Sequence, residues 1–349
     1  MFYKYQSPVL QMFGQYFSFF GLPFYNVTLK NTNCIFLCIF NILQLLLLCY
    51  SCTFLDPFEI RSSENRCTLI RKPLFLFFTQ FSVVLLFPFI SVAGSFSTVY
   101  HGRQIMALLD SPCFSEFFCK NRKQSRLIFF LLVVANHISF ISVLNYKLSF
   151  PVTSLLVRIM ELLSLYMICN IGLVSCNVQH YISYATICIL SDIERKLIIS
   201  NMMNHSAIVL KIRNMAEIHY KVNNRMSFIN VIYLLLYIFV YILTITNGFI
   251  CHFSLDLFIR SLVPFAYIAY LANSNRKILT AVNRISMHLK KKPIEKASIN
   301  TFKNQSELIE LYSQHFHMKA FRLFDFNTHF LLQLFVLATS YVVFFSQTN

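Results

Sequence analysis

The stretch that decides the fold is residues 228–253, FINVIYLLLYIFVYILTITNGFICHF, which contains no Asp, Glu, Lys or Arg. About 20 consecutive apolar residues are enough for an α-helix to cross a bilayer. In lipid the backbone N–H and C=O groups must be paired within the segment, so we expect this block to be helical. The block therefore predicts a membrane-spanning helix.

Six more apolar blocks lie on either side of this one. They predict further spans at 34–54, 74–96, 127–148, 155–178, 257–272 and 326–345. The composition agrees, because 56% of the residues are hydrophobic and only 13% are charged, whereas soluble domains carry about 25% charged residues. We therefore expect an all-α, polytopic protein of the plasma membrane, in which residues 1–349 form a single seven-helix transmembrane domain.

The distribution of Lys and Arg predicts the orientation. Of these residues, 23 fall on one side of the predicted membrane and five on the other. Cytoplasmic segments carry the excess of positive charge, so we expect the N-terminus in the cytoplasm and the C-terminus outside the cell. The N-x-S/T sequons at Asn26, Asn204 and Asn304 should then carry no glycan. We interpret the net charge of +16 as basic loops that face the anionic cytoplasmic leaflet of the bilayer. It does not indicate nucleic-acid binding.

Two long segments on the cytoplasmic side, 179–227 and 273–325, should be helical. Asn304, with Glu307 three residues later, is a candidate helix cap. We interpret both segments as extensions of the fourth to seventh spans that pack together below the membrane. Their apolar residues recur at roughly helical spacing, with His219 continuing the first series: Ile193, Leu197, Ile208, Ile212 and Met215, then Leu308, Leu311, Tyr312 and Phe316.

The chain shows no pattern typical of an enzyme. Most of the 11 Cys lie inside apolar blocks, and Cys113, Cys119 and His101 are too irregularly spaced for a typical zinc site. No phosphate-binding loop and no G-x-S-x-G motif occurs. We therefore expect no catalytic residue, no cofactor and no metal.

The end of the sequence carries a more specific pattern. Residues 318–347 read MKAFRLFDFNTHFLLQLFVLATSYVVFFSQ, which resembles the terminal signature of insect gustatory receptors: a Phe-rich helix entry, Thr-Tyr, five mostly apolar residues and Gln-Phe. Ser340 replaces the Thr directly before the Tyr, and Thr348 replaces the final Phe. His219 with Asn230 resembles a second, weaker family feature. The residues that match the signature are Ala320, Leu323, Phe324, Thr339, Tyr341 and Gln347.

This resemblance implies a ligand-gated, non-selective cation channel of the insect chemoreceptor superfamily. It implies a homo- or hetero-tetramer with related receptor subunits, joined by the cytoplasmic helices, with the seventh span lining the pore for permeant cations. A small-molecule tastant would bind in the outer half, among the second to sixth spans. Sugar-sensing members typically have Glu after the Tyr, and Val342 at that position argues against that subgroup.

The candidate pore residues lie near the end of the seventh span. Gln347 either forms a polar ring at the pore mouth or is a polar residue at the membrane interface, with Phe344 and Val343 one turn deeper as an apolar constriction. Ser340 lies on the same segment. Ser340 and Thr339 bond either to their own helix or to a neighbouring one. We interpret Tyr341 as a buried aromatic residue that fixes packing.

The candidate pocket residues lie in earlier spans. Arg158 and Glu161, three residues apart, either bind ligand in an open pocket or neutralise each other. The other candidates suit a pocket for small organic molecules, although such side chains also serve helix packing: Gln80, His137, Tyr237, Tyr241 and Thr244.

Two other classes of membrane protein remain as alternatives. A G-protein-coupled type of receptor also has seven helices, but the charge asymmetry here predicts the opposite orientation. A secondary transporter would need coupled charges in the membrane and helices broken by Gly or Pro. The whole chain has only six Gly, and no internal repeat is visible.

Overall fold

The structure is a computed structural model. It describes residues 155–199, 205–250, 255–291, 299–320, 324–325 and 327–347, most of 100–131, and single positions between 46 and 141. Within the helices, the side chains of 155–176, 231–250 and 255–265 are not among those described. The spans predicted at 34–54 and 74–96 lie outside the described residues except for Leu46 and Ala93.

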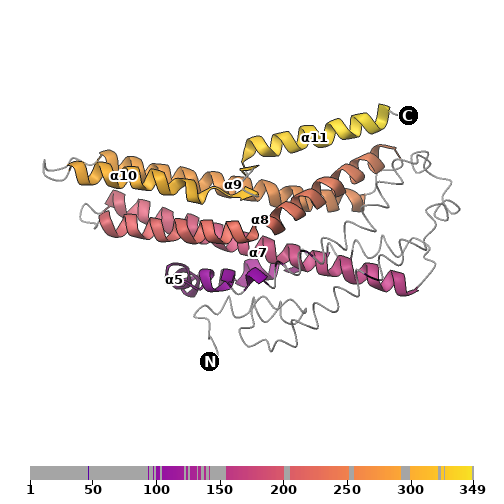
Figure 1. Ribbon diagram of the computed structural model, residues 1–349, viewed down its shortest axis with the longest axis horizontal. Helices are drawn as coiled ribbons and strands as arrows, with labels where there is room; N and C mark the ends of the chain where they lie inside the picture. The colour runs from indigo at the N-terminus through magenta and orange to yellow at the C-terminus, as the bar shows by residue number, and fades with distance from the viewer. Residues whose placement is uncertain are drawn as a thin grey trace, which may run out of the picture.

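Helices make up most of the described chain (Figure 1). The predicted all-α class is confirmed, apart from a small hairpin that the sequence analysis did not predict. In that hairpin Lys319 pairs with Asp325 and Ala320 with Phe324, antiparallel. The elements in order are α5 (Pro112–Lys120), α7 (Leu155–Ile199), α8 (His205–Ile250), α9 (Leu255–Lys291), α10 (Ile299–Ser313), η4 (Gln314–Phe316), β1 (Lys319–Ala320), β2 (Phe324–Asp325) and α11 (Thr328–Gln347).

The long helices follow the apolar blocks and continue beyond them. Helix α7 begins at Leu155 and runs past the predicted span to Ile199, so the predicted continuation through Leu197 is confirmed. Helix α8 covers 228–250 of the block at 228–253, and α11 covers 328–345 of the block at 326–345. Over the part of the chain that the structure describes, we find no helix both long enough and apolar enough to cross a membrane.

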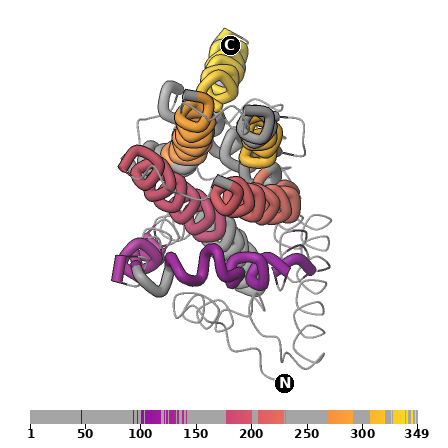
Figure 2. Tube along the Cα trace, turned by 90° about the vertical axis from the view of Figure 1, so that its left-hand side faces the viewer, coloured from indigo at the N-terminus to yellow at the C-terminus, as the bar shows by residue number. Residues whose placement is uncertain are grey.

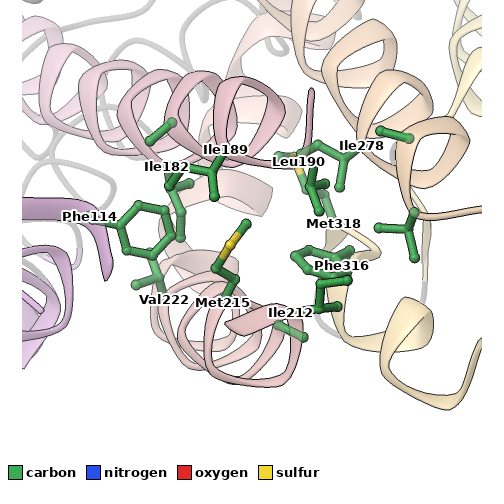
Figure 3. Close-up of a cluster of buried hydrophobic side chains, with 14 of the residues drawn as sticks. Phe114, Ile182, Ile189, Leu190, Ile212, Met215, Val222, Ile278, Phe316 and Met318 are labelled. Carbon is green, nitrogen blue, oxygen red and sulfur yellow. The ribbon is translucent and has the colours of Figure 1, made fainter. Parts of the chain in front are cut away.

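Helices α7, α8, α9 and α10 pack side by side around an apolar core (Figure 2). Helix α5 closes one side, where Phe114 lies beside Ile182 and Val222 (Figure 3). Burying one such side chain contributes about 1.5–3 kcal/mol, so the core is the main force that holds the helices together. The series predicted in 179–227 is confirmed, because all six of its residues are buried: Ile193, Leu197, Ile208, Ile212, Met215 and His219.

Helix α10 departs from two expectations. It begins at Ile299, so Asn304 lies inside the helix and the prediction that it caps the helix was wrong. The helix starts more than a turn upstream of the capping motif. Leu308 and Leu311 are exposed, whereas Ile309 between them is fully buried. Helix α10 lies at the edge of the bundle, so α8 and α9 cover only one of its faces.

Two ion pairs connect neighbouring helices of the bundle. Arg284 of α9 lies 3.1 Å from Glu194 of α7. Glu310 of α10 accepts hydrogen bonds from Lys290 and Ser286 of α9. Exposed pairs of this kind contribute about 0–1 kcal/mol each, so they set the register of the helices more than their stability.

Candidate functional site

Helix α11, which the sequence predicts as the pore helix, is attached to the bundle at its start. The Asn327 side chain accepts a hydrogen bond from the Phe330 N–H, with 2.8 Å between Oδ1 and N. This contact is an N-terminal helix cap. Phe330 is buried, and Leu331 and Leu334 pack against the core. These contacts fix the point from which the helix leads away to the end of the described chain (Figure 1).

Beyond these first two turns, the described side chains of α11 are exposed. Val343 and Phe344, the predicted constriction, have exposed fractions of 45% and 55%. Gln347 is exposed at the last residue of the helix. The Tyr341 side chain lies outside the described set. The helix therefore presents an apolar surface that the described parts of the same chain do not cover.

Thr339 and Ser340 of α11 bond to their own helix. Thr339 donates to the carbonyl of Phe335 and Ser340 to the carbonyl of Val336, both at 2.8 Å. Of the two arrangements that the sequence left open, back-bonding within the helix is the one observed. Their donor capacity is thus used locally, which leaves the hydroxyl oxygens as acceptors.

The predicted pocket residues fall on several elements. Arg158 and Glu161 lie on α7, and Tyr237, Tyr241 and Thr244 on α8, but their side chains are outside the described set. Gln80 lies outside the described residues altogether. The Nδ1 atom of His137 lies 2.9 Å from the Val133 carbonyl oxygen. The role of these residues in a pocket stays a prediction.

An aromatic cluster that the sequence analysis did not identify joins α7 to α9. His180 Nδ1 lies 2.5 Å from the hydroxyl of Tyr270. The His180 ring stacks on Tyr184 at 5.7 Å, and Tyr184 meets the ring of Phe117 of α5 at 5.7 Å. Burial lowers the pKa of His180 to about 4, so the ring is neutral at pH 7. The cluster lies at the inner ends of the predicted fourth and sixth spans.

His219, part of the weaker family feature, is completely buried in the bundle. Its ring meets Phe316 of η4 at 5.6 Å, close to edge-on. Neither of its ring nitrogens has a hydrogen-bond partner among the described residues. Burial lowers the pKa of His219 to about 4, so it too is neutral at pH 7. Asn230, its partner in the family feature, is also buried on α8.

Two buried amides bind the backbone that follows η4. Asn223 Nδ2 of α8 donates to the carbonyl oxygen of His317 at 3.2 Å. The N–H of Met318 donates to Oδ1 of Asn275 of α9 at 3.5 Å. Sequence reasoning missed both residues, although Asn223 lies one helical turn after His219 in an apolar stripe, which is a detectable signal.

A row of buried polar residues runs along α7. Gln179, Ser183 and Thr186 lie on one face of the helix and are almost completely buried. Their side-chain polar atoms have no hydrogen-bond partner among the described residues. Searched over the same residues, the chain shows no group of three His, Cys, Asp or Glu that could hold a metal ion. The side chains of this row are thus uncharged.

The arrangement of these helices is similar to that of solved insect olfactory receptor structures. The solved structure of olfactory receptor OR5 from Machilis hrabei in complex with eugenol matches with a TM-score of 0.63, covering 97% of this chain and 98% of that chain at 13% identity. A second structure of OR5 gives a TM-score of 0.57, covering 93% of this chain and 90% of that chain at 10% identity. No protein-family model and no curated protein matches the sequence. This chain therefore shares the fold of OR5, and the gustatory subtype stays a prediction.

Proposed function

We propose that this chain is a gustatory-type chemosensory receptor that acts as a ligand-gated, non-selective cation channel in the plasma membrane. The observation that carries the proposal is the fold shared with OR5, a receptor solved with the small organic molecule eugenol. The signature at 318–347 adds the gustatory subtype. The shared fold supports a single architecture for the predicted spans, pore and pocket, which remain part of the proposal.

A lipid environment is supported by an exposed apolar stripe. Six described residues between 127 and 141 recur three or four apart, with Phe130 and Leu131 adjacent, so they share one helix face. All six are more than a third exposed, and soluble proteins rarely expose so large an apolar patch. We propose that lipid chains contact this face. Its residues are Leu127, Phe130, Leu131, Val134, Ile138 and Ile141.

In the proposed channel, four copies of α11 line one pore. The exposed apolar side chains of Val343 and Phe344 form a constriction that closes by excluding water. Gln347 places a polar ring at the outer mouth, and Ser340 offers its hydroxyl oxygen to the lumen one turn below Phe344. Outward movement of the four helices widens the constriction, and cations cross down their gradient.

The proposed ligand is a small organic tastant. It binds among the second to sixth spans, where Tyr237, Tyr241 and Thr244 line one side and Arg158 and Glu161 another. Amphipathic aromatic side chains with a few polar groups are typical of such pockets. The ligand opens the channel because it binds the open state more tightly than the closed state.

The proposed tetramer uses the bundle formed by α7 to α10. Large apolar side chains are exposed on several of its helices, although this part of the chain lies outside every predicted span. We propose that neighbouring subunits bury these side chains, because exposed apolar patches mark interaction surfaces. The residues are Ile198, Ile199, Leu210, Leu308 and Leu311.

Current recording in a non-neuronal cell line tests the proposal. The receptor is expressed alone, and small organic compounds are screened for evoked current. Gln347→Ala should change the Ca²⁺ to Na⁺ permeability ratio by about two-fold or more, because a ring of side chains at the mouth helps to set selectivity. The matched control is Gln104→Ala, an exposed glutamine outside α11. It should leave the ratio unchanged.

Two results would count against the channel. Ligand responses that depend wholly on G proteins would favour the alternative class of receptor. Ligand-evoked currents with the same permeability ratio in both Gln347→Ala and the original protein would contradict the proposal that α11 lines the pore mouth.

A further inference from the structure

The three residues Phe316, His317 and Met318, which we call the latch, connect α10 to the hairpin that leads into α11. Phe316 and Met318 are almost completely buried, and Figure 3 shows them beside Ile212 of α8 and Ile278 of α9. A linker between two helices normally runs over the surface. The latch instead inserts both of its apolar side chains into the core, so its position follows the position of α8 and α9.

The backbone of the latch is held from two sides. Asn223 of α8 donates to the His317 carbonyl at 3.2 Å, and Asn275 of α9 accepts from the Met318 N–H at 3.5 Å. Both amides are buried, with exposed fractions of 6% and 2%. A bond of 3.5 Å is at the long limit for N–H···O, so the Asn223 contact is the stronger of the two.

The helix that carries Asn223 also carries the proposed pocket residues. Tyr237, Tyr241 and Thr244 lie further along α8, on the same continuous helix of 46 residues. The latch is followed by β1, β2 and then the capped start of α11. A displacement of α8 that begins at the pocket can therefore reach the start of the pore helix by two routes: the direct packing of α11 on α8 and α9, and the side-chain hydrogen bond to the buried linker.

We propose that Asn223, assisted by Asn275, is a positioning residue that transmits ligand-driven movement of α8 and α9 to α11 through the latch. The inference rests on the proposed function. Breaking the contact leaves the pocket and the direct packing of α11 on α8 intact but removes the part of the coupling that passes through the latch. Ligand binding is then retained, and its effect on opening is reduced.

The test compares Asn223→Ala with Asn224→Ala. Asn224 is the next residue on α8 and is exposed, so it controls for the change of residue type. Asn223→Ala should lower the open-to-closed ratio at saturating ligand by about three- to ten-fold, the worth of one neutral hydrogen bond. The affinity of Asn223→Ala for a labelled ligand, measured on membranes, should stay within about two-fold of the affinity of the original protein. Asn223→Gln, which keeps the donor, should recover part of the opening.

A second measurement does not depend on channel activity. Amide hydrogen exchange of residues 316–328 in the purified full chain should be faster in Asn223→Ala and unchanged in Asn224→Ala, because one anchor of the latch is gone. Asn275→Ala is made in parallel and should have the same effect at a smaller size. If Asn223→Ala does not reach the membrane, Asn275→Ala takes its place as the test variant.

The outcomes separate the two proposals. Faster exchange without any ligand-gated current in the original protein keeps the latch and rejects the channel. Ligand-gated current that opens equally well in Asn223→Ala and Asn224→Ala, with equal exchange, rejects the latch and keeps the channel. A parallel loss of ligand affinity and opening in Asn223→Ala also rejects it, since that is the result expected of a general packing defect.

Discussion

At the scale of single residues, His219 links burial to titration. Its ring is fully buried against Phe316, and burial lowers its pKa to about 4. In the unfolded chain the pKa is about 6.5. The folded state therefore binds a proton less readily than the unfolded state does. The stability that this difference contributes is complete above pH 6.5 and is lost as the pH falls through 4.

His219→Leu should reduce the acid sensitivity of the fold. At pH 5 the variant escapes a proton-linked loss of about 2 kcal/mol that the original chain suffers, so its thermal midpoint should exceed that of the original by several degrees. The measurement is thermal unfolding of purified protein between pH 7 and pH 5. The control is His329→Leu, since His329 is exposed on α11. Equal pH dependence in all three proteins would contradict the burial argument.

At the scale of elements, the start of α11 depends on one cap. Asn327→Ala removes the acceptor for the Phe330 N–H and should cost about 1 kcal/mol, seen as faster hydrogen exchange in the first turn of the helix. Asn327→Ser restores a capping oxygen and should exchange almost as slowly as the original chain. If Ser behaves like Ala, the cap does not define where the helix begins.

Helical spacing predicted the core of α7 and α8 well. The apolar residues predicted to recur at helical spacing are all buried: Ile193, Leu197, Ile208, Ile212 and Met215. The same reasoning was wrong for Leu308 and Leu311 on α10. Periodicity identifies an apolar face but does not say what covers it, and among the described elements α10 has neighbours on one side only.

The candidate site was less predictable than the helices. The order and length of the helices follow from local composition, whereas the bonds of Asn223 and Asn275 to the latch join residues far apart in the sequence. No spacing rule places an amide opposite a backbone carbonyl 94 residues away. The hairpin is too short, at two residues per strand, to leave a periodic signal. The predicted role of Gln347 came from resemblance to a family.

At the scale of the whole molecule, the asymmetry of Lys and Arg makes a prediction about topology. A tag placed after Asn349 should be labelled on intact cells, and a tag before Met1 only after permeabilisation, because 23 of the basic residues then lie on the cytoplasmic side and five outside. Glycan mapping provides the second reading. Asn304 lies on α10 in the bundle and should carry no sugar. A glycan at this position would contradict the predicted orientation.

The way α11 is attached has a mechanical consequence for the proposed channel. The helix has 20 residues, about 30 Å at 1.5 Å per residue, and only its first two turns are seated on the bundle. We expect the rest of the helix to tilt as a rigid body about a pivot at Phe330. A tilt of about 10° at that pivot carries the far end by about 5 Å, which exceeds the diameter of a water molecule. In the proposed channel, small adjustments beside the latch would therefore become larger displacements at Phe344, and four such helices moving together would wet the pore.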